Sequence, residues 1–505
     1  MSLAEYYDRS AVAASQVVAG FNAEAFHDAV SDTVVGIALD DNAATSPEGQ
    51  AALDLSVRLM ARLYPALAIR AEGSRAVGFA SELGDLARSI NPKIDLVEHA
   101  ETGIVVGAVT QPWAHAVYAG SDGWVGRVSM AEPIPIGRTL LPFGGGVAAC
   151  LAASAIFRAL LDHSASRPGT AQLCSWTGPI DSQLPASQAD GRHRLPERTV
   201  LVGAGAIGQA ASWAIARSPL AGVLHVVDGE LLDLGNMQRY VLTGRTDLDQ
   251  PKAALAANHI NHEQARLGGQ LRAVPHPVDW VGALLEAGPT WDCALAAVDS
   301  AAARRAVQAA LPRWVANAWT QPGDLGVSEH DFITGACLAC LYLPTGTTRN
   351  EDQLVADALG IPEHRADVRM LLYTGDPPAD ELLALIAARL GVDPDVLTAF
   401  RQRSIRELYV EGICGGAVLP LGSIEATANV HVPLAHQSAL AGVLLAARLA
   451  RQAAGISLGR SEVTRFDVRR DPIQDATLPV RKGSQPICIC QDADYTSAYA
   501  ELWGN

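Results

Sequence analysis

The chain has 505 residues, 49% of them hydrophobic, a length typical of two to four compact units. Its formal net charge of −16 argues against nucleic acid as a partner, because binding the phosphate backbone needs clustered Lys and Arg. No membrane span is expected, since the most apolar stretches, 144–161 and 438–450, carry charges or are too short. No export signal follows Met1, so we expect a soluble, cytoplasmic protein.

The first part of the chain, residues 1–165, predicts an α/β domain. Apolar runs indicate strands at 33–39, 66–70, 94–98, 103–109 and 114–118, and helices at 50–63 and 79–90. The domain ends in a Gly-rich turn, 142–147, and an apolar helix, much as residues 418–423 lead into the helix 438–450. This similarity indicates two copies of one fold. The stretch 166–197, rich in Ser, Pro and Gly, is expected to link them.

A βαβ unit is predicted at residues 199–227. A short apolar strand passes directly into a loop with Gly203, Gly205 and Gly208, and a helix follows. The glycines let a phosphate approach the backbone, and the helix N-terminus supplies unpaired N–H groups. Asp228 ends the second strand, where a carboxylate binds ribose hydroxyls. The unit predicts a nucleotide site, and alone it is most typical of dehydrogenases.

Two cations downstream change this interpretation. Arg239 and Lys252 follow the ribose carboxylate, and Lys252 is expected to open a helix. A nicotinamide site has little use for fixed cations here. An enzyme that splits ATP needs them, because negative charge builds on the phosphates as pyrophosphate leaves.

The motifs of this region resemble those of ubiquitin-activating enzymes and their bacterial relatives ThiF and MoeB. The family's glycine loop is followed by Asp-x-Asp, Asn-x-Gln-Arg and Pro-Lys, matched here by Asp228, Glu230, Asn236, Gln238, Arg239, Pro251 and Lys252. One position departs, because Glu230 stands where the family has its second Asp. The resemblance implies a Rossmann-like, ThiF-type adenylation domain that uses ATP and Mg²⁺.

The resemblance also implies roles for single residues. Asp228 and Glu230 belong to the nucleotide site with the three glycines, and Asn236 and Gln238 orient the phosphates. Asp299 ends the buried strand predicted at 291–298 and is expected to hold Mg²⁺, which prefers one or two carboxylates plus phosphate oxygens. The alternative for Asp299 is a helix N-cap.

The N-terminal domain lacks the glycine loop and the Asn-x-Gln-Arg motif. We therefore interpret it as a degenerate, inactive copy that packs on the active one as an internal pseudo-dimer; a further homodimer stays open. In the resembled family a Tyr-x-Arg near the N-terminus supplies an arginine to the partner half's ATP site, and Arg9 in Tyr7-Asp8-Arg9 is the candidate. The alternative is a solvated arginine near a frayed end.

The eight cysteines point to metal binding or catalysis more than to disulfides. Cys337 and Cys340 form a CxxC pair, and Cys488 and Cys490 form a CxC pair far downstream. Together they predict a tetrahedral zinc site of the structural kind, since four thiolates leave no open position for a substrate. The resembled family carries such a zinc, normally on two CxxC pairs.

A helical insert is expected at 344–411, between the two parts of the active domain at 198–343 and 412–505. Just after it lies Cys414, flanked by Gly415. The resemblance implies that this cysteine accepts the activated acyl group; the alternative is a small buried residue. His431 and His436 lie nearby without a selective spacing, and Cys150, Cys174 and Cys293 are expected in the core.

Three functions follow from these motifs. The first is ATP-dependent activation of a ubiquitin-like protein's C-terminus, with a thioester on Cys414 and transfer to a ubiquitin-conjugating-like enzyme, as in bacterial conjugation operons, some of them antiviral. The second is a ThiF- or MoeB-like activator of a sulfur-carrier protein. The third, from another class, is an NAD-dependent oxidoreductase, which would leave Arg239, Lys252 and the paired cysteines unused; a non-enzymatic scaffold is a further alternative.

Overall fold

The structure is a computed structural model that describes residues 7–15, 21–161, 169–176, 191–321, 324–343, 351–409, 434–456, 461–467, 474–483 and 488–504. The chain forms two compact units. The main unit comprises Met1–Ser10, Val17–Leu343 and Pro433–Asn505, and the helical unit comprises Ala11–Gln16 and Pro344–Val432.

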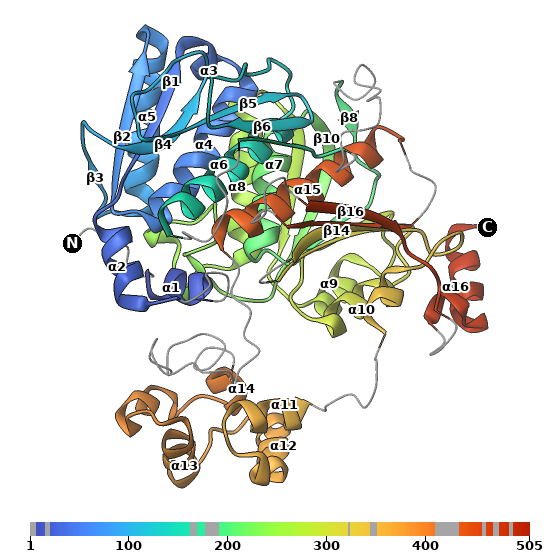
Figure 1. Cartoon of the computed structure of the whole chain (residues 1–505). Coiled ribbons are helices and arrows are strands. Elements are labelled where there is room, and N and C mark those ends of the chain that lie inside the picture. The colour runs from blue at the N-terminus through green and yellow to red at the C-terminus, as the bar shows by residue number, and fades with distance from the viewer. Residues whose placement is uncertain are drawn as a thin grey trace. The chain divides into compact units, whose positions relative to one another are not determined.

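The N-terminal half of the main unit is built on a seven-stranded sheet of order β3-β2-β1-β4-β5-β6-β7 (Figure 1). Strands β1 to β5 are mutually parallel, and β6 and β7 are antiparallel to their neighbours. The strands are β1 Val34–Asp40, β2 Ala66–Glu72, β3 Asp95–Leu96, β4 Thr102–Val106, β5 His115–Asp122, β6 Val125–Ser129 and β7 Thr170–Cys174. The helices are α1 Tyr7–Ser15, which continues beyond this half, α2 Ala23–Ser31, α3 Asp41–Thr45, α4 Pro47–Leu63, α5 Ser74–Ile90 and α6 Phe143–Leu161.

The C-terminal half holds a nine-stranded sheet of order β11-β10-β9-β12-β13-β14-β15-β16, with β8 added beside β10. Its strands are β8 His193–Arg194, β9 Thr199–Val202, β10 Leu220–Val227, β11 Gln270–His276, β12 Cys293–Ala296, β13 Trp314–Gln321, β14 Asp324–His330, β15 Glu462–Asp467 and β16 Gln474–Pro479. Its helices are α7 Ala206–Arg217, α8 Lys252–Arg266, α9 Trp280–Ala287, α10 Ala301–Ala309, α15 Ala435–Ala453 and α16 Ala493–Trp503, with 3-10 turns η1 Leu234–Asn236, η2 Arg245–Asp247, η3 Leu338–Tyr342 and η7 Ile489–Gln491.

The two sheets repeat one topology. Each begins at a central strand, β1 or β9, adds two parallel strands on one side and two on the other, and then turns antiparallel through a hairpin. In each half a long apolar helix, α6 or α15, follows the hairpin and precedes the next antiparallel strand. The α/β, Rossmann-like fold class that the sequence predicted is therefore confirmed.

The halves meet through their helices. α4 and α6 cover the N-terminal sheet, α15 packs on α7 and on β13, and α6 lies beside α15 in the middle of the unit (Figure 1). At this contact Gly146 of α6 leaves room for Trp213 of α7 and Val443 of α15. By length and composition Phe143–Leu160 of α6 would pass as a membrane span, but 89% of that window is buried inside the protein.

A buried ion cluster joins α4 to α7. Asp54 pairs with Arg58 at 2.7 Å and with Arg217 at 3.1 Å, and it accepts a hydrogen bond from Nε1 of Trp213 at 2.7 Å. Burial alone would raise the pKa of Asp54, but Arg217 and Arg58 outweigh burial and hold this pKa well below its usual range. The carboxylate is therefore charged in the folded protein and fixes the two halves against each other.

The helical unit has a core of its own. Val355, Leu359, Val368, Ile386 and Phe400 are buried together there. The elements are α11 Glu351–Ala358, η4 Pro362–His364, α12 Arg365–Thr374, α13 Asp380–Leu390, η5 Pro394–Phe400 and α14 Ile405–Glu407.

The structure differs from the sequence-based expectation in two places. The stretch 166–197, expected as a linker, contains β7, which pairs with β6 as the edge of the N-terminal sheet. Its short alternating sequence, Thr-Ala-Gln-Leu-Cys, was hidden among Ser, Pro and Gly. Within the expected helical insert, residues 394–409 do not continue as one helix: they form a 3-10 segment and a separate turn that begins at the capping residue Ser404.

We expect Asp54→Asn to lower the free energy of unfolding by about 3–5 kcal/mol, because it removes the carboxylate that pairs with the buried Arg58, although Arg217 keeps its ion pair with Glu263 at 2.9 Å. Since the folded-state pKa of Asp54 lies below the unfolded value of about 3.9, its contribution is present at neutral pH and lost on acidification. Urea unfolding at pH 7 measures the change. Asp85→Asn, which removes an exposed carboxylate paired with Arg88, is the control and should cost less than about 1 kcal/mol; equal effects of the two variants would contradict the prediction.

Candidate functional site

The carboxyl ends of three central strands form one rim in the C-terminal half. β9 lies between β10 and β12, and the register aligns Val202 with Val227 and with Ala296. The chain order reverses at β9, the point where open α/β sheets bind ligands. Gly203, next along the chain, has φ +95°, and a side chain there would meet the carbonyl oxygen of Ala297 at 2.6 Å. The glycine loop therefore bends into the rim as the sequence predicted.

The first turn of α7 follows this loop. Gly205 is the N-cap of α7, and because glycine has no side chain it makes no capping bond to the first backbone N–H groups of the helix. Gly208 packs against the loop itself, because a side chain there would collide with the carbonyl oxygen of Gly203. An anion is stabilised at such a helix end by the N–H groups and the dipole together.

Asp228 lies beside the glycine loop at the end of β10. Its carboxylate accepts hydrogen bonds from the backbone N–H of Ala204 at 2.7 Å and of Glu230 at 2.9 Å. Burial raises the pKa of Asp228, although Lys252 and the two backbone donors act in the opposite direction. The carboxylate links the loop to the segment that carries Glu230.

Tyr240 brings the two predicted cations together. Its ring lies 5.6 Å from the guanidinium carbon of Arg239 and 5.4 Å from Nζ of Lys252, and its hydroxyl faces Gly205. Lys252 is buried and forms an ion pair with the exposed Glu230. Burial alone would lower the pKa of Lys252, but Tyr240, Glu230 and Asp228 outweigh it and raise this pKa above its usual value. Lys252 is therefore a fixed cation at the rim.

The Asn-x-Gln-Arg segment contributes donors to the same place. Asn236 accepts the N–H of Asp233 at 3.1 Å and shapes the η1 turn. Gln238 is buried, and neither its Nε2 nor NH1 of Arg239 has a hydrogen-bond partner among the described residues. Buried donors without partners are costly, and phosphate oxygens would satisfy them. Nε2 and NH1 thus fit an anionic ligand.

Asp299 follows β12 at the same rim. Its side chain is exposed, and the N-cap of α10 is Ser300, whose hydroxyl accepts the N–H of Ala303 at 3.0 Å. The capping alternative for Asp299 is therefore wrong. The carboxylate is free to act as the Mg²⁺ ligand that the resemblance implies, and that role remains a prediction.

For Arg9 the structure describes only the backbone, which lies in α1. Its neighbour Ser10 lines a cavity of about 30 Å³ together with Arg62, Tyr64, Gln238 and His436. α1 thus reaches the back of the Asn-x-Gln-Arg segment. His436 is buried there, and burial followed by Arg158 lowers its pKa to about 3, so it is a neutral residue of the interior.

Cys414 and His431 lie outside the described residues, and the acceptor role of Cys414 remains a prediction. Three other cysteines are buried as expected: Cys150 in α6, Cys174 in β7 and Cys293 in β12. Burial and the neighbouring Asp292 raise the pKa of Cys293 to about 12, which makes it a poor nucleophile.

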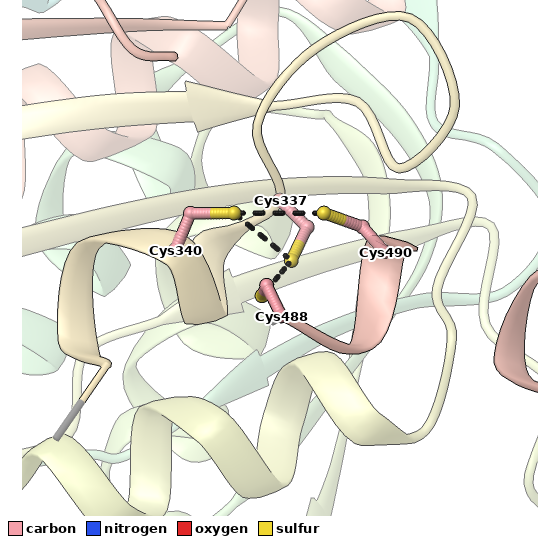
Figure 2. A group of neighbouring side chains, drawn as sticks. All are labelled: Cys337, Cys340, Cys488 and Cys490. Carbon is pink, nitrogen blue, oxygen red and sulfur yellow. Dashed lines mark hydrogen bonds between the residues drawn. The ribbon is translucent and has the colours of Figure 1, made fainter. Parts of the chain in front are cut away.

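The four paired cysteines converge in the main unit. Their sulfur atoms point at one another (Figure 2) and all lie within 4.8 Å of one another. Cys337 is 3.5 Å from Cys488 and 4.0 Å from Cys340, and Cys340 is 3.5 Å from Cys490. Zn–S bonds of 2.3 Å in a tetrahedron place sulfurs about 3.8 Å apart. The group therefore has the donors and spacing of a structural zinc site, and the CxC pair fits as well as a CxxC.

Residues that the sequence did not single out connect this cysteine group to the rim. Helix α10, which follows Asp299, is bonded to η3 between the cysteines: Gln308 accepts the N–H of Leu338 at 2.7 Å, and Arg305 donates to the carbonyl of Tyr342 at 2.8 Å. Tyr240 was also missed, although an aromatic residue directly after the motif arginine was a visible signal.

Comparison with known proteins agrees with this site. Residues 180–357 match the ThiF family, and residues 38–162 match prokaryotic E2 family C. Residues 180–357 therefore form a ThiF-family domain. Over 520 residues, covering 100% of this chain and 98% of the relative, the chain is 40% identical to y4jF of Sinorhizobium fredii, described as uncharacterized, and it belongs to the same family as that protein. Family membership supports ATP-dependent adenylation in general.

Solved structures with partial similarity include the Escherichia coli protein MccB with ATP, which is 14% identical with a TM-score of 0.37 and covers 74% of this chain and 98% of that one. The microcin C7 biosynthetic enzyme MccB in complex with N-formylated MccA is 13% identical with a TM-score of 0.36, covering 74% and 96%.

We expect purified protein to hold about one zinc ion per chain on Cys337, Cys340, Cys488 and Cys490, because four thiolates at this spacing match structural zinc. Elemental analysis after dialysis measures it. Cys340→Ser should lose the metal and lower the melting temperature, since metal binding and folding are coupled. Cys174→Ala serves as the control and should keep the zinc; a metal-free wild type would rule the site out.

Proposed function

We propose that this ThiF-family protein activates the C-terminus of a ubiquitin-like protein: it adenylates the carboxylate with ATP, forms a thioester on Cys414 and passes the acyl group to a ubiquitin-conjugating-like enzyme. We expect it to act in the cytoplasm and to be encoded in a bacterial operon for ubiquitin-like conjugation. Some operons of this kind serve antiviral defence.

One observation carries the adenylation step: glycine-loop amides, Asp228 and two cations meet at a single rim. Arg239 and Lys252 both lie against Tyr240, and Tyr240 lies against Gly205 at the start of α7. A ribose carboxylate, an amide cradle and paired cations match a nucleotide whose phosphates gain charge during the reaction. An NAD-dependent oxidoreductase would use the ribose carboxylate and the amide cradle but would have no use for Arg239 and Lys252.

In the first step a carboxylate oxygen of the carrier attacks the α-phosphorus of ATP. The new bond is C–O–P, the bond between the α-phosphorus and the bridging oxygen breaks, and pyrophosphate leaves with that electron pair. Lys252 and Arg239 offset the charge on the phosphates, and Gln238 donates to them. Asp299 would hold Mg²⁺, which supplies further positive charge.

In the second step the thiolate of Cys414 attacks the acyl carbon, and AMP leaves with the electrons of the C–O bond. Attack by a thiolate on an activated acyl group is ordinary nucleophilic catalysis. The thioester then exchanges onto the cysteine of the conjugating enzyme. A sulfur-carrier activator, the runner-up, needs no such relay.

We further propose that the N-terminal half is an inactive copy of the adenylation domain. It repeats the strand order, but β1 ends at Asp40 where β9 leads into Gly203. Asp40 accepts the N–H of Ala43 at 2.7 Å and of Ala108 at 2.8 Å, and it is in register with Glu72 at the end of β2. Two carboxylates thus stand side by side at this rim without a neighbouring glycine loop, and their negative charge disfavours an anionic ligand.

The similarity of residues 38–162 to an E2 family raises a different function for this half, namely acyl transfer. Cys150 is the one cysteine in that range, and it is 1% exposed in the middle of α6. Burial raises its pKa well above that of an ordinary thiol. We therefore assign the transfer cysteine to a separate enzyme.

Lys252→Ala or Asp299→Ala should each lower ATP–pyrophosphate exchange with the carrier by about a hundred- to a thousandfold, since each removes charge needed as pyrophosphate leaves. Circular dichroism should show an unchanged fold. Arg272→Ala, which removes an exposed cation from β11, is the matched control and should keep wild-type exchange. Near-normal exchange in both site variants would refute the assignment of this rim.

Cys414→Ala should keep pyrophosphate exchange and lose the thiol-sensitive adduct between enzyme and carrier, because adenylation does not use this thiol. Non-reducing gels of enzyme, carrier and ATP, with and without added thiol, measure the adduct. An adduct that persists in Cys414→Ala places the nucleophile elsewhere. A wild type that exchanges pyrophosphate but forms no adduct favours the sulfur-carrier function.

A further inference from the structure

We infer that Arg58 and Arg62, both on α4 of the N-terminal half, are positioning residues for the nucleotide site of the C-terminal half. They hold the backbone of Tyr240, Val241 and Thr243, directly after the Asn-x-Gln-Arg motif. The inference rests on the proposed adenylation site, and it gives the inactive half a task there.

The contacts run from side chains of one half to carbonyl groups of the other. Arg58 donates through NH1 to the carbonyl of Val241 at 2.9 Å. Arg62 donates to the carbonyl of Tyr240 through both Nε, at 3.1 Å, and NH2, and NH2 also donates to the carbonyl of Thr243 at 2.6 Å. Arg62 is 2% exposed, so these bonds are shielded from water.

The segment needs these donors because it is irregular and buried. Tyr240, Val241 and Thr243 have exposures of 5% or less, and they lie between η1 and η2, outside any helix or strand. Thr243 donates its N–H, at 3.3 Å, and its hydroxyl, at 3.0 Å, to the carbonyl of Tyr240, whereas the carbonyls of Val241 and Thr243 are paired with the arginines of α4. Buried carbonyl groups must be paired. A guanidinium offers several N–H groups in one rigid plane and serves neighbouring carbonyls at once, which a lysine ammonium cannot reproduce.

Holding the carbonyl of Tyr240 also holds its ring. The ring lies against the guanidinium of Arg239 and the ammonium of Lys252, so a shift of the backbone at Tyr240 moves the support of both cations. Arg62 also borders the cavity that Gln238 lines. Misplacement by about 1 Å can cost a hundredfold in rate.

Two further contacts fix the ends of the segment. Gln209 of α7 accepts the N–H of Leu242 at 3.2 Å. Gly244 approaches α5 of the N-terminal half so closely that a side chain there would lie 2.5 Å from the carbonyl oxygen of Ser89. The segment is therefore held from both sides. α7 of its own half binds the N–H of Leu242, and the N-terminal half contacts its carbonyls and Gly244.

The test is Arg62→Lys, which keeps the charge but loses the planar fork. We expect the amides of residues 240–243 to exchange with deuterium about ten- to a hundredfold faster, as expected for two lost buried hydrogen bonds. Arg448→Lys is the matched control: Arg448 is also a buried arginine between the halves, donating to the carbonyl of Trp176 at 2.7 Å, far from this segment in sequence and contacts. It should leave exchange at 240–243 unchanged.

The functional readout is a double-mutant cycle. Arg62→Lys should lower pyrophosphate exchange about tenfold or more, and the loss should be clearly smaller in an Arg239→Ala background, because residues that act through one another are non-additive. If Arg62→Lys fails to fold, Arg58→Lys tests the same link through the single bond to Val241, with a smaller effect in the same direction.

The outcomes separate the two proposals. Unchanged deuterium exchange at 240–243 overturns the positioning role. Faster deuterium exchange also overturns it if pyrophosphate exchange stays at the wild-type rate, or if the loss of pyrophosphate exchange adds fully to that of Arg239→Ala. If wild type neither binds ATP nor exchanges pyrophosphate, the proposed function fails, and deuterium exchange alone then decides whether Arg62 holds the segment.

Discussion

The burial of irregular backbone at the contact between the two halves is the constraint on which the site depends. The loop that follows Gln238 and Arg239 is neither helix nor strand, so its carbonyls lack ladder partners. Arginines from α4 provide the partners, and Asp54 keeps one of those arginines and Arg217 compensated within the same interior. The stability of the interface and the geometry of the site therefore share one set of buried charges.

A second support enters from the opposite side of the site. The cysteine group fixes η3, η3 is bonded to α10 through Gln308 and Arg305, and α10 begins one residue after Asp299. The C-terminal helix α16 closes over the group, where Tyr499 stacks on Phe332 at 4.8 Å and Trp503 donates to the carbonyl of Leu311 at 2.9 Å. The cysteine group is thus connected through η3 to the helix that follows Asp299.

The fold and the nucleotide rim could be predicted because local signals carry them. Strand β9 begins at Thr199, the first residue of the predicted βαβ unit, and Lys252 opens α8 as expected, because apolar runs, glycines and prolines mark these boundaries in the sequence itself. Gly203 needs its positive φ wherever the fold places it. The paired cysteines were visible as pairs, and their convergence followed from chemistry.

The contacts between the halves could not be predicted in this way. Arg58 and Arg62 lie about 180 residues before the carbonyls they hold, in a helix whose sequence alone reads as an ordinary amphipathic one. Sequence periodicity reports which face of a helix is buried, and it carries no information on which distant loop meets that face. β7 was missed for a different reason: its five alternating residues stand in a stretch rich in Ser, Pro and Gly, a composition that indicated a linker.

The residue at the end of the first strand differs between the two halves that share one strand order. The residue at the end of the first strand either lets the backbone turn close to a phosphate, as Gly203 does, or places a carboxylate there, as Asp40 does. In the N-terminal half this carboxylate accepts the backbone N–H groups of Ala43 and Ala108. Under the proposed function the N-terminal half binds no nucleotide, so the shape of a nucleotide does not constrain its residues. Its first long helix, α4, is then free to carry large charged side chains toward the partner half, which is where Arg58 and Arg62 lie.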